Sequence, residues 1–170
     1  MAKIELKGFD VYIRQIEALA QSSEKMCKAV VYPGAAILAD KLRAATEALP
    51  TISDAEALGN FRSGQVNETL SVSQKAGLLA GFGITSIRRD RKGMIQASVG
   101  FDGYNSVKTR HFPNGQPNPE VARSLEKGTS YLKRNRFVEG AVKAAEAEAV
   151  AAMQAEADAF IAKKMQENGG

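Results

Sequence analysis

The clearest alternation of apolar and polar positions lies within residues 93–129. Apolar residues alternate there with polar or small ones, which is the period-two pattern of a half-buried β-strand. These apolar residues are Ile95, Ala97, Val99 and Phe101. Turn-forming residues follow, and a helical pattern then runs from Pro119 to Glu126. The stretch predicts a strand, a long exposed loop at about 100–119 and a closing helix. Loops of this length usually bind something or are disordered, and we interpret this one as an interaction loop.

Helical spacing dominates the N-terminal third of the chain. Lys3–Lys7 predicts a short strand, and apolar residues at three- and four-residue intervals predict a helix over Phe9–Ala20. Ser22 and Ser23 offer an N-cap for a second helix that runs to about Leu49. We expect a kink or break at Pro33-Gly34, because proline removes a backbone hydrogen bond and clashes with the preceding turn.

The middle of the chain is less regular. Thr51–Leu70 is polar and difficult to assign: Ser53 and the residues after it resemble a helix start, but Gly59 and Gly64 favour a mobile segment. A short helix over Val72–Ala80 is predicted next, capped by a serine at 71 or 73.

A hairpin is predicted from two strands, 84–89 and 94–101, joined by a tip at 90–93. Its positive residues are Arg88, Arg89, Arg91 and Lys92. Two interpretations stay open. The cluster is either a solvated tip that keeps a strand edge from pairing wrongly, or a contact with an acidic partner such as a protein ring or DNA phosphates.

The last predicted helix runs from about Arg136 to Gln166, with Asn135 as its N-cap. One stripe at mostly four-residue spacing marks its apolar face. The stripe consists of Phe137, Ala141, Ala145, Ala149, Met153, Ala157 and Phe160. The helix would be roughly 45 Å long, more than a small sheet can cover. Its far half is narrow-faced and rich in alanine, which suits packing against a neighbouring subunit.

These elements predict an α+β fold, a small antiparallel β-sheet flanked by helices with a long C-terminal helix. We expect a core domain over 1–136, and a helix over 137–170 that belongs to it or extends it as an interface. The chain has 170 residues, no Trp and much alanine. Such a chain has a modest core, so we expect part of its apolar surface to be buried between subunits.

The composition indicates in which cellular compartment the protein is expected. The single Cys27 forms no internal disulfide. No apolar stretch is as long as the apolar core of a signal peptide at the N-terminus or as a membrane-spanning segment elsewhere. We therefore expect a cytosolic protein without a membrane partner. The net charge of +4 is mild for a dedicated nucleic-acid module.

The sequence contains few of the residue patterns that indicate an enzyme. His111 is the only histidine, and no serine or cysteine has a histidine partner readable from the sequence. Metal-ligand and phosphate-loop motifs are absent, and Gly81-Phe82-Gly83 follows a helix, the reverse of a dinucleotide fingerprint. We expect neither an enzyme nor a metal or other cofactor.

Several runs together resemble the tail-component family of long-tailed double-stranded DNA phages and prophages. The quoted runs are KAGLLAGFGIT (75–85), GFDGYNSVKT (100–109), FPNGQPNPEVARSLEKGTS (112–130) and NRFVEGAV (135–142). One departure is visible: Arg136-Phe137 stands where such proteins usually have Pro-Phe.

The resemblance implies a virion structural protein at the phage neck or tail end, active in tail completion, tail termination or head–tail joining. It implies a tail-terminator-like fold, commonly a hexameric ring, with neighbouring neck or tail-tube proteins as partners. Such a protein passes through the host cytoplasm during assembly and ends in the virion. The implied subunit or partner contacts are Phe101, Tyr104, Phe112, Phe137, Met153 and Phe160. Arg88, Arg89, Arg91 and Lys92 would line the lumen and touch DNA in transit. The alternative is a basic nucleic-acid-binding protein that uses the hairpin at 88–93.

Overall fold

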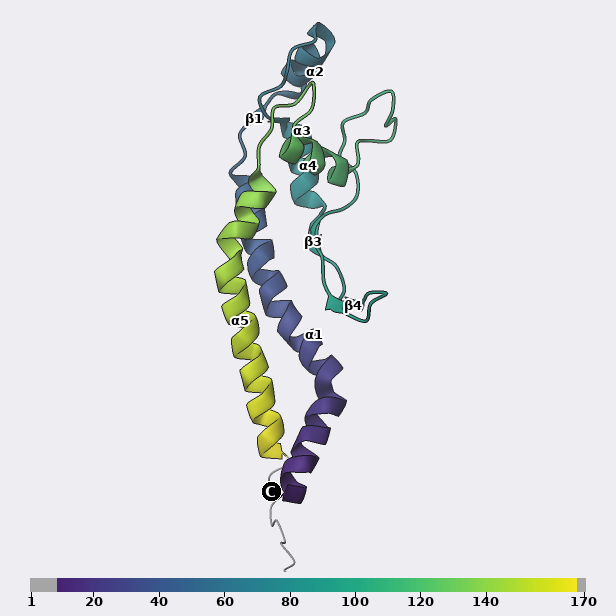
Figure 1. Cartoon of the computed structure of the whole chain (residues 1–170). Coiled ribbons are helices and arrows are strands. Elements are labelled where there is room, and N and C mark those ends of the chain that lie inside the picture. Colours follow the sequence, from purple (N-terminus) through teal and green to yellow (C-terminus); the bar gives the residue numbers. More distant parts are fainter. Residues whose placement is uncertain (1–8, 168–170) are drawn as a thin grey trace, which may run out of the picture.

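The computed structural model describes residues 9–167, with side chains from Gln15 onward. Figure 1 shows a stalk of two long helices, α1 and α5, which carries a smaller head built from the middle of the chain. α1 spans Phe9–Glu47 and α5 spans Phe137–Glu167. The strand predicted at Lys3–Lys7 lies outside the described residues.

α1 and α5 run side by side in opposite directions (Figure 1). Three contacts join them from the free end of the stalk to the head: Gln15 with Met165, Gly34 with Met153 and Lys41 with Glu148. A Cβ atom on Gly34 would lie 2.5 Å from Met153 Sδ, so the missing side chain allows the helices to approach closely. The apolar stripe of the long C-terminal helix is therefore covered by α1 of its own chain. The length of the helix had predicted packing against a neighbouring subunit.

The N-terminal region is one helix and not the two that the sequence predicted. Ser22 and Ser23 lie inside α1, and so does Pro33. An internal proline costs about 3 kcal/mol in a helix. Packing along α5 on both sides of Pro33 opposes this cost, so the helix continues through a position where local propensity favours a break.

Three short helices form the head: α2 (Asp54–Ser63), α3 (Val72–Ala80) and α4 (Asn118–Lys127). β1 (Thr51–Ile52) pairs in parallel with β2 (Leu70–Ser71) beside them. The helices predicted at 72–80 and 119–126 are thus confirmed.

The segment expected to be mobile contains α2. Ser53 Oγ accepts a hydrogen bond from Glu56 N at 3.1 Å and caps the start of the helix. Gly64 ends the helix with a φ of 73°, a left-handed conformation that glycine adopts at little cost. Gly64 therefore ends a helix there and does not mark a mobile segment.

The predicted hairpin is present as two short antiparallel ladders. β3 (Phe82–Ile84) pairs with β6 (Val99–Phe101), and β4 (Arg88–Arg89) pairs with β5 (Ile95–Gln96) nearer the tip. The fold class is α+β, as predicted, but the sheets formed by the described residues have only two strands each. Helices supply most of the packed surface.

The core lies where the head meets the end of the stalk. Its buried members come from α1, α3, α4 and α5 and from the segments between them. They are Leu42, Leu49, Leu70, Leu78, Val121, Ala122, Leu125, Leu132, Phe137 and Ala141. The ring of Phe101 lies 5.6 Å from that of Phe82 and 6.0 Å from that of Phe137, so the hairpin packs on this core through its aromatic face.

A neighbouring helix, rather than a local residue, caps the start of α5. The carboxylate of Glu126 in α4 accepts hydrogen bonds from Val138 N at 2.9 Å and Glu139 N at 3.1 Å. Asn135, the predicted cap, instead donates its backbone N–H to Leu125 O. Glu126 thus satisfies free N–H groups of the helix terminus and places its negative charge at the positive end of the helix dipole.

The core predicts a large effect for Leu125→Ala. Leu125 has no exposed surface, and truncating such a leucine removes burial and leaves a cavity. The free energy of unfolding should fall by about 2–5 kcal/mol in urea denaturation. Leu58→Ala is the matched control, because Leu58 is 48% exposed in α2. A loss below about 1 kcal/mol for Leu125→Ala would contradict the described core.

Candidate assembly site

The interaction loop is anchored by the side chain of Asn118, the first residue of α4, which is only 2% exposed. Its Nδ2 donates to Gly77 O at 2.8 Å and to Asp102 O at 2.7 Å. Its backbone N–H donates to Gly103 O at 2.9 Å. One residue thus joins α3, the end of β6 and the start of α4, and both ends of the loop meet at it.

A second layer of hydrogen bonds closes the base of the loop. Asn105 N donates to Gln116 O at 2.9 Å, and Gln116 N donates to Val107 O at 3.0 Å. Gln74 Nε2, from α3, donates to Gln116 Oε1 at 2.8 Å. The two stems are therefore paired, and the loop expected at about 100–119 has a defined base with an exposed tip.

This anchor has an energetic cost. Asn105 Nδ2 and Asn118 Oδ1 are buried and have no hydrogen-bond partner among the described residues. Each such group costs about 1–3 kcal/mol. The two asparagines are thus better explained by the loop shape that they impose than by a contribution to stability.

Three glycines make the close approach of backbone segments at this anchor possible. A Cβ atom on Gly81 would lie 2.0 Å from Asp102 O, and one on Gly77 would lie 2.3 Å from the Asn105 side chain. Gly115 has a φ of 118°, which residues with a side chain rarely adopt. Because backbone or a packed side chain occupies the space, no larger residue fits at these positions without moving the loop.

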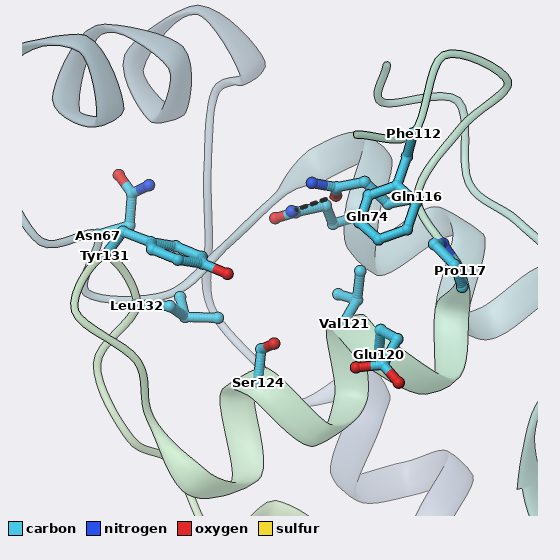
Figure 2. A pocket seen from close by; sticks show the side chains of 10 residues that line it. All are labelled: Asn67, Gln74, Phe112, Gln116, Pro117, Glu120, Val121, Ser124, Tyr131 and Leu132. Atoms are coloured by element: carbon cyan, nitrogen blue, oxygen red, sulfur yellow. Dashed lines mark hydrogen bonds between the residues drawn. The ribbon is translucent and has the colours of Figure 1, made fainter. Parts of the chain in front are cut away.

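A groove of about 220 Å³ lies beside the loop. Figure 2 shows the side chains that line it. α4 forms its floor, Phe112 stands on one side and Tyr131 on the other, with the Tyr131 hydroxyl directed into the groove (Figure 2). The lining residues are Asn67, Gln74, Phe112, Gln116, Pro117, Glu120, Val121, Ser124, Tyr131 and Leu132. Amide, hydroxyl and aromatic groups of this kind suit contact with a polypeptide.

Four of the predicted aromatic contacts divide into two groups. Tyr104 is 68% exposed and Phe112 is 38% exposed, so both lie on the surface of the loop. Phe137 is buried in the core of the chain itself and Phe101 is partly buried against that core, so both side chains pack within the chain rather than on a free surface. The cause is the register of the hairpin, which turns Phe101 toward α5 rather than toward solvent.

The two predicted contacts in the far half of α5 are half-buried. Met153 packs against Gly34 of α1, and Phe160 lies on the same stripe of the helix. Their stripe faces α1, so contact with another subunit would use only their exposed edges. The predicted aromatic and methionine contacts are thus not one surface: loop, core and stalk hold two each.

The basic residues do gather on the hairpin. Arg89 forms an ion pair with Glu24 of α1 at 2.9 Å. Hydrogen bonds and ion pairs from Lys28 first, and from Arg89 next, lower the pKa of the Glu24 carboxyl. Arg88, Arg91 and Lys92 are exposed and form no ion pair with any described residue. Three of the four predicted cations therefore remain available to a partner.

No group of three or more His, Cys, Asp or Glu side chains is placed to hold a metal ion within residues 9–167. His111 is exposed in the loop, and Cys27 is partly buried in α1. No helix in the part of the chain that the structure describes is long and apolar enough to cross a membrane.

Comparisons with models of known protein families, with curated proteins and with solved structures find no match to this chain.

Sequence reasoning missed the residues that shape the site, namely Gln74, Asn118 and Tyr131. Asn118 stands between two prolines and looked like part of a turn. A usable signal was present, because proline at the position after Asn118 suits the first turn of a helix. The partners of its side chain lie 16 and 41 residues away, so no local pattern could reveal them.

The glycine contacts predict opposite effects for two alanine substitutions. Gly81→Ala should lower the free energy of unfolding by about 1–3 kcal/mol, because the new methyl group collides with the Asp102 carbonyl. Gly59→Ala, in α2, meets nothing within 4 Å and should raise it by about 0.5–1 kcal/mol. Urea denaturation of both variants tests this, and equal effects would contradict the described loop anchor.

The stability of the fold should depend on pH through Asp54, which connects α2 to α3. Its carboxylate accepts hydrogen bonds from Ser73 Oγ at 2.6 Å and Ser73 N at 3.2 Å. Hydrogen bonding to Ser71 and then Ser73 lowers the pKa of Asp54, against a smaller opposing effect of burial.

A carboxyl whose pKa is lower in the folded state stabilises the fold above its unfolded value of about 3.9, and this stabilisation is lost as pH falls through the folded pKa. Asp54→Asn should therefore be less stable than the parent at pH 7, by less than about 1 kcal/mol because the group is exposed. The difference should shrink below about pH 3.5 in thermal melts. A constant difference between pH 7 and pH 2.5 would refute this role of Asp54.

Proposed function

We propose that the chain is a structural protein of the phage virion, placed at the neck or tail end. It would act in tail completion, tail termination or head–tail joining, and it would assemble as a ring. No catalytic role is proposed. The proposal starts from the resemblance of 75–85, 100–109, 112–130 and 135–142 to phage tail-component proteins.

One observation carries the proposal: the first three of these runs meet at a single structural feature, the base of the loop. Gly77 and Gly81 belong to the first run, Asp102 and Asn105 to the second, and Asn118 to the third. All five pack or hydrogen-bond at the base of the exposed loop. An anchor of this kind supports a role in which a loop of fixed shape is presented to another protein.

The surface of the head supports contact with proteins. Exposed apolar side chains lie on the loop and beside the groove, among them Phe61, Tyr104, Phe112 and Tyr131. Exposed apolar groups that gather near one groove indicate an interaction site. We assign this region to contacts with neighbouring neck or tail-tube proteins, and the long stalk to contacts between subunits of a ring of six, as the resemblance implies.

The place in the particle follows from the same proposal. The protein would be made in the host cytoplasm and remain in the virion. Arg88, Arg91 and Lys92 would then contact either DNA in transit through the lumen or an acidic surface of a neighbouring subunit. Arg89 is less suited to this role, because its ion pair with Glu24 already uses its charge.

A genetic experiment tests the proposal. The coding sequence is inactivated in an inducible prophage that carries it, and the particles are examined by electron microscopy and plaque assay. We expect filled heads and separate or abnormal tails, with infectivity restored by a plasmid copy. Mass spectrometry of purified parental particles should detect the chain. Infectious particles that lack the protein would overturn the proposal.

Nucleic-acid binding through the hairpin is the alternative, and it is favoured by the three cations that form no ion pair with any described residue. A binder that uses three phosphate contacts should lose roughly 40-fold in affinity between 50 and 200 mM salt. A gel shift with Arg91→Glu and Lys92→Glu variants measures this. A steep, charge-dependent shift together with normal particles in the genetic experiment would favour the alternative.

A further inference from the structure

Two glycines of the hairpin are required neither by packing nor by backbone conformation within the described part of the chain. Gly83 of β3 and Gly100 of β6 are directly paired. Neither has a positive φ, and a Cβ atom on either would meet nothing within 4 Å. Glycine weakens a strand, and it often marks a place where another molecule approaches the backbone closely. This pair differs from Gly77 and Gly81, whose space is filled by the chain itself.

The glycine pair faces outward. Directly paired residues of an antiparallel ladder share a face, and successive residues alternate between faces. The Phe82–Phe101 pair faces the core, where the Arg43 guanidinium of α1 lies 5.2 Å from the centre of the Phe82 ring. Gly83 and Gly100 therefore expose bare backbone on the opposite face, in a shallow hollow of about 460 Å³.

The hairpin around this bare face is positive. Arg88, Arg91 and Lys92 lie between β3 and β6 in the sequence, exposed and without an ion-pair partner among the described residues. Asp90 is the only carboxylate between Phe82 and Phe101. A partner that lies on the glycine pair should therefore be narrow, so that it can reach the backbone, and negative.

The outward side of α5 has both properties. Small residues follow one another on the exposed side of this helix, and Val150 projects beside them at 56% exposure. The exposed small residues are Gly140, Ala144, Ala147 and Ala151. Between Phe137 and Phe160 the helix has five carboxylates, of which Glu139 and Glu148 form ion pairs within the chain. Glu146, Glu156 and Asp158 form no ion pair with any described residue, so the charge left on the helix is opposite to that of the hairpin.

One molecule cannot bring these two surfaces together. α1 contacts both α5 and the hairpin strands and lies between them, with α5 on one side and β3 and β4 on the other (Figure 1). A second copy can supply the helix. Contact between two different surfaces of identical chains is heterologous, and it continues until a ring closes or a filament forms.

We propose that the outward face of α5 in one copy docks on the Gly83–Gly100 face of the hairpin in a second copy. Val150 and the neighbouring alanines lie on the bare backbone, and the carboxylates of α5 meet the cations of the hairpin. The contact deepens the proposed function, because it supplies the interface between subunits of the ring. It uses the hairpin cations for subunit contact rather than for DNA.

The first test uses a substitution that should preserve the fold and remove the contact. The double variant Gly83→Val and Gly100→Val fills the outward face with residues that favour strands, so the melting temperature should stay level or rise. Association, measured by light scattering behind a sizing column, should weaken at least roughly 100-fold because the side chains hold the helix away. Gly59→Ala, a glycine with open space elsewhere on the head, is the matched control and should associate like the parent.

The second test uses the directionality of the contact. Ala147→Arg blocks the helix face and leaves the hairpin face intact, and arginine is a good helix former at an exposed position. Each blocked variant should be monomeric alone, and an equimolar mixture should form a dimer of one chain of each kind and nothing larger. That dimer would carry one native contact between an intact helix and an intact hairpin.

The possible results separate the two proposals. A parent protein that remains monomeric up to about 100 µM, a glycine variant that still associates, or a mixture without the one-to-one dimer overturns the docking contact. The role in the virion is decided by the genetic experiment alone. If the parent and the glycine variant associate equally well, and the genetic experiment shows that the phage needs the protein, the virion role is kept. The subunits would then associate through a different interface.

Discussion

The buried amide of Asn118 is the interaction on which the head depends. It satisfies carbonyl groups of α3 and of the residue after β6, while its own backbone begins α4. This side chain thus connects the hairpin, the loop and α4 and helps to fix their positions relative to one another. Glycines surround it because the backbone segments that it joins lie too close together for any larger residue.

The stalk provides the second constraint. α1 and α5 bury their stripes against each other, and the core of the head sits on the end of this pair. Glu126 connects the two regions, since a carboxylate of α4 caps the first turn of α5. The head and the stalk therefore share residues at their junction, and a displacement of α4 would disturb both the loop and the long helix.

This arrangement leaves three surfaces for other molecules: the tip of the loop with its groove, the bare face of the hairpin, and the outward side of α5. Each has a physical property that the chain itself does not use. The loop exposes aromatic rings, the hairpin exposes backbone and positive charge, and α5 exposes small residues and negative charge. The complementarity of the last two is the reason to regard them as partners in different copies of the chain.

The sequence by itself determined the elements whose pattern is local. The hairpin, α3, α4 and the long C-terminal helix follow from periodicity, turn residues and caps, and the α+β class follows from their order. The exposed positions of Tyr104 and Phe112 were also predictable, because both lie among turn formers.

Only the tertiary structure decided the remaining features, because they depend on groups far apart in the chain. α1 continues through Pro33 because α5 packs along it. The carboxylate of Glu126, and not Asn135, caps the start of α5. Phe137 lies in the core and Phe101 packs against it because the hairpin lies on the junction of head and stalk. The loop anchor at Asn118 is the clearest case, since its hydrogen-bond partners come from two other elements and no local pattern specifies them.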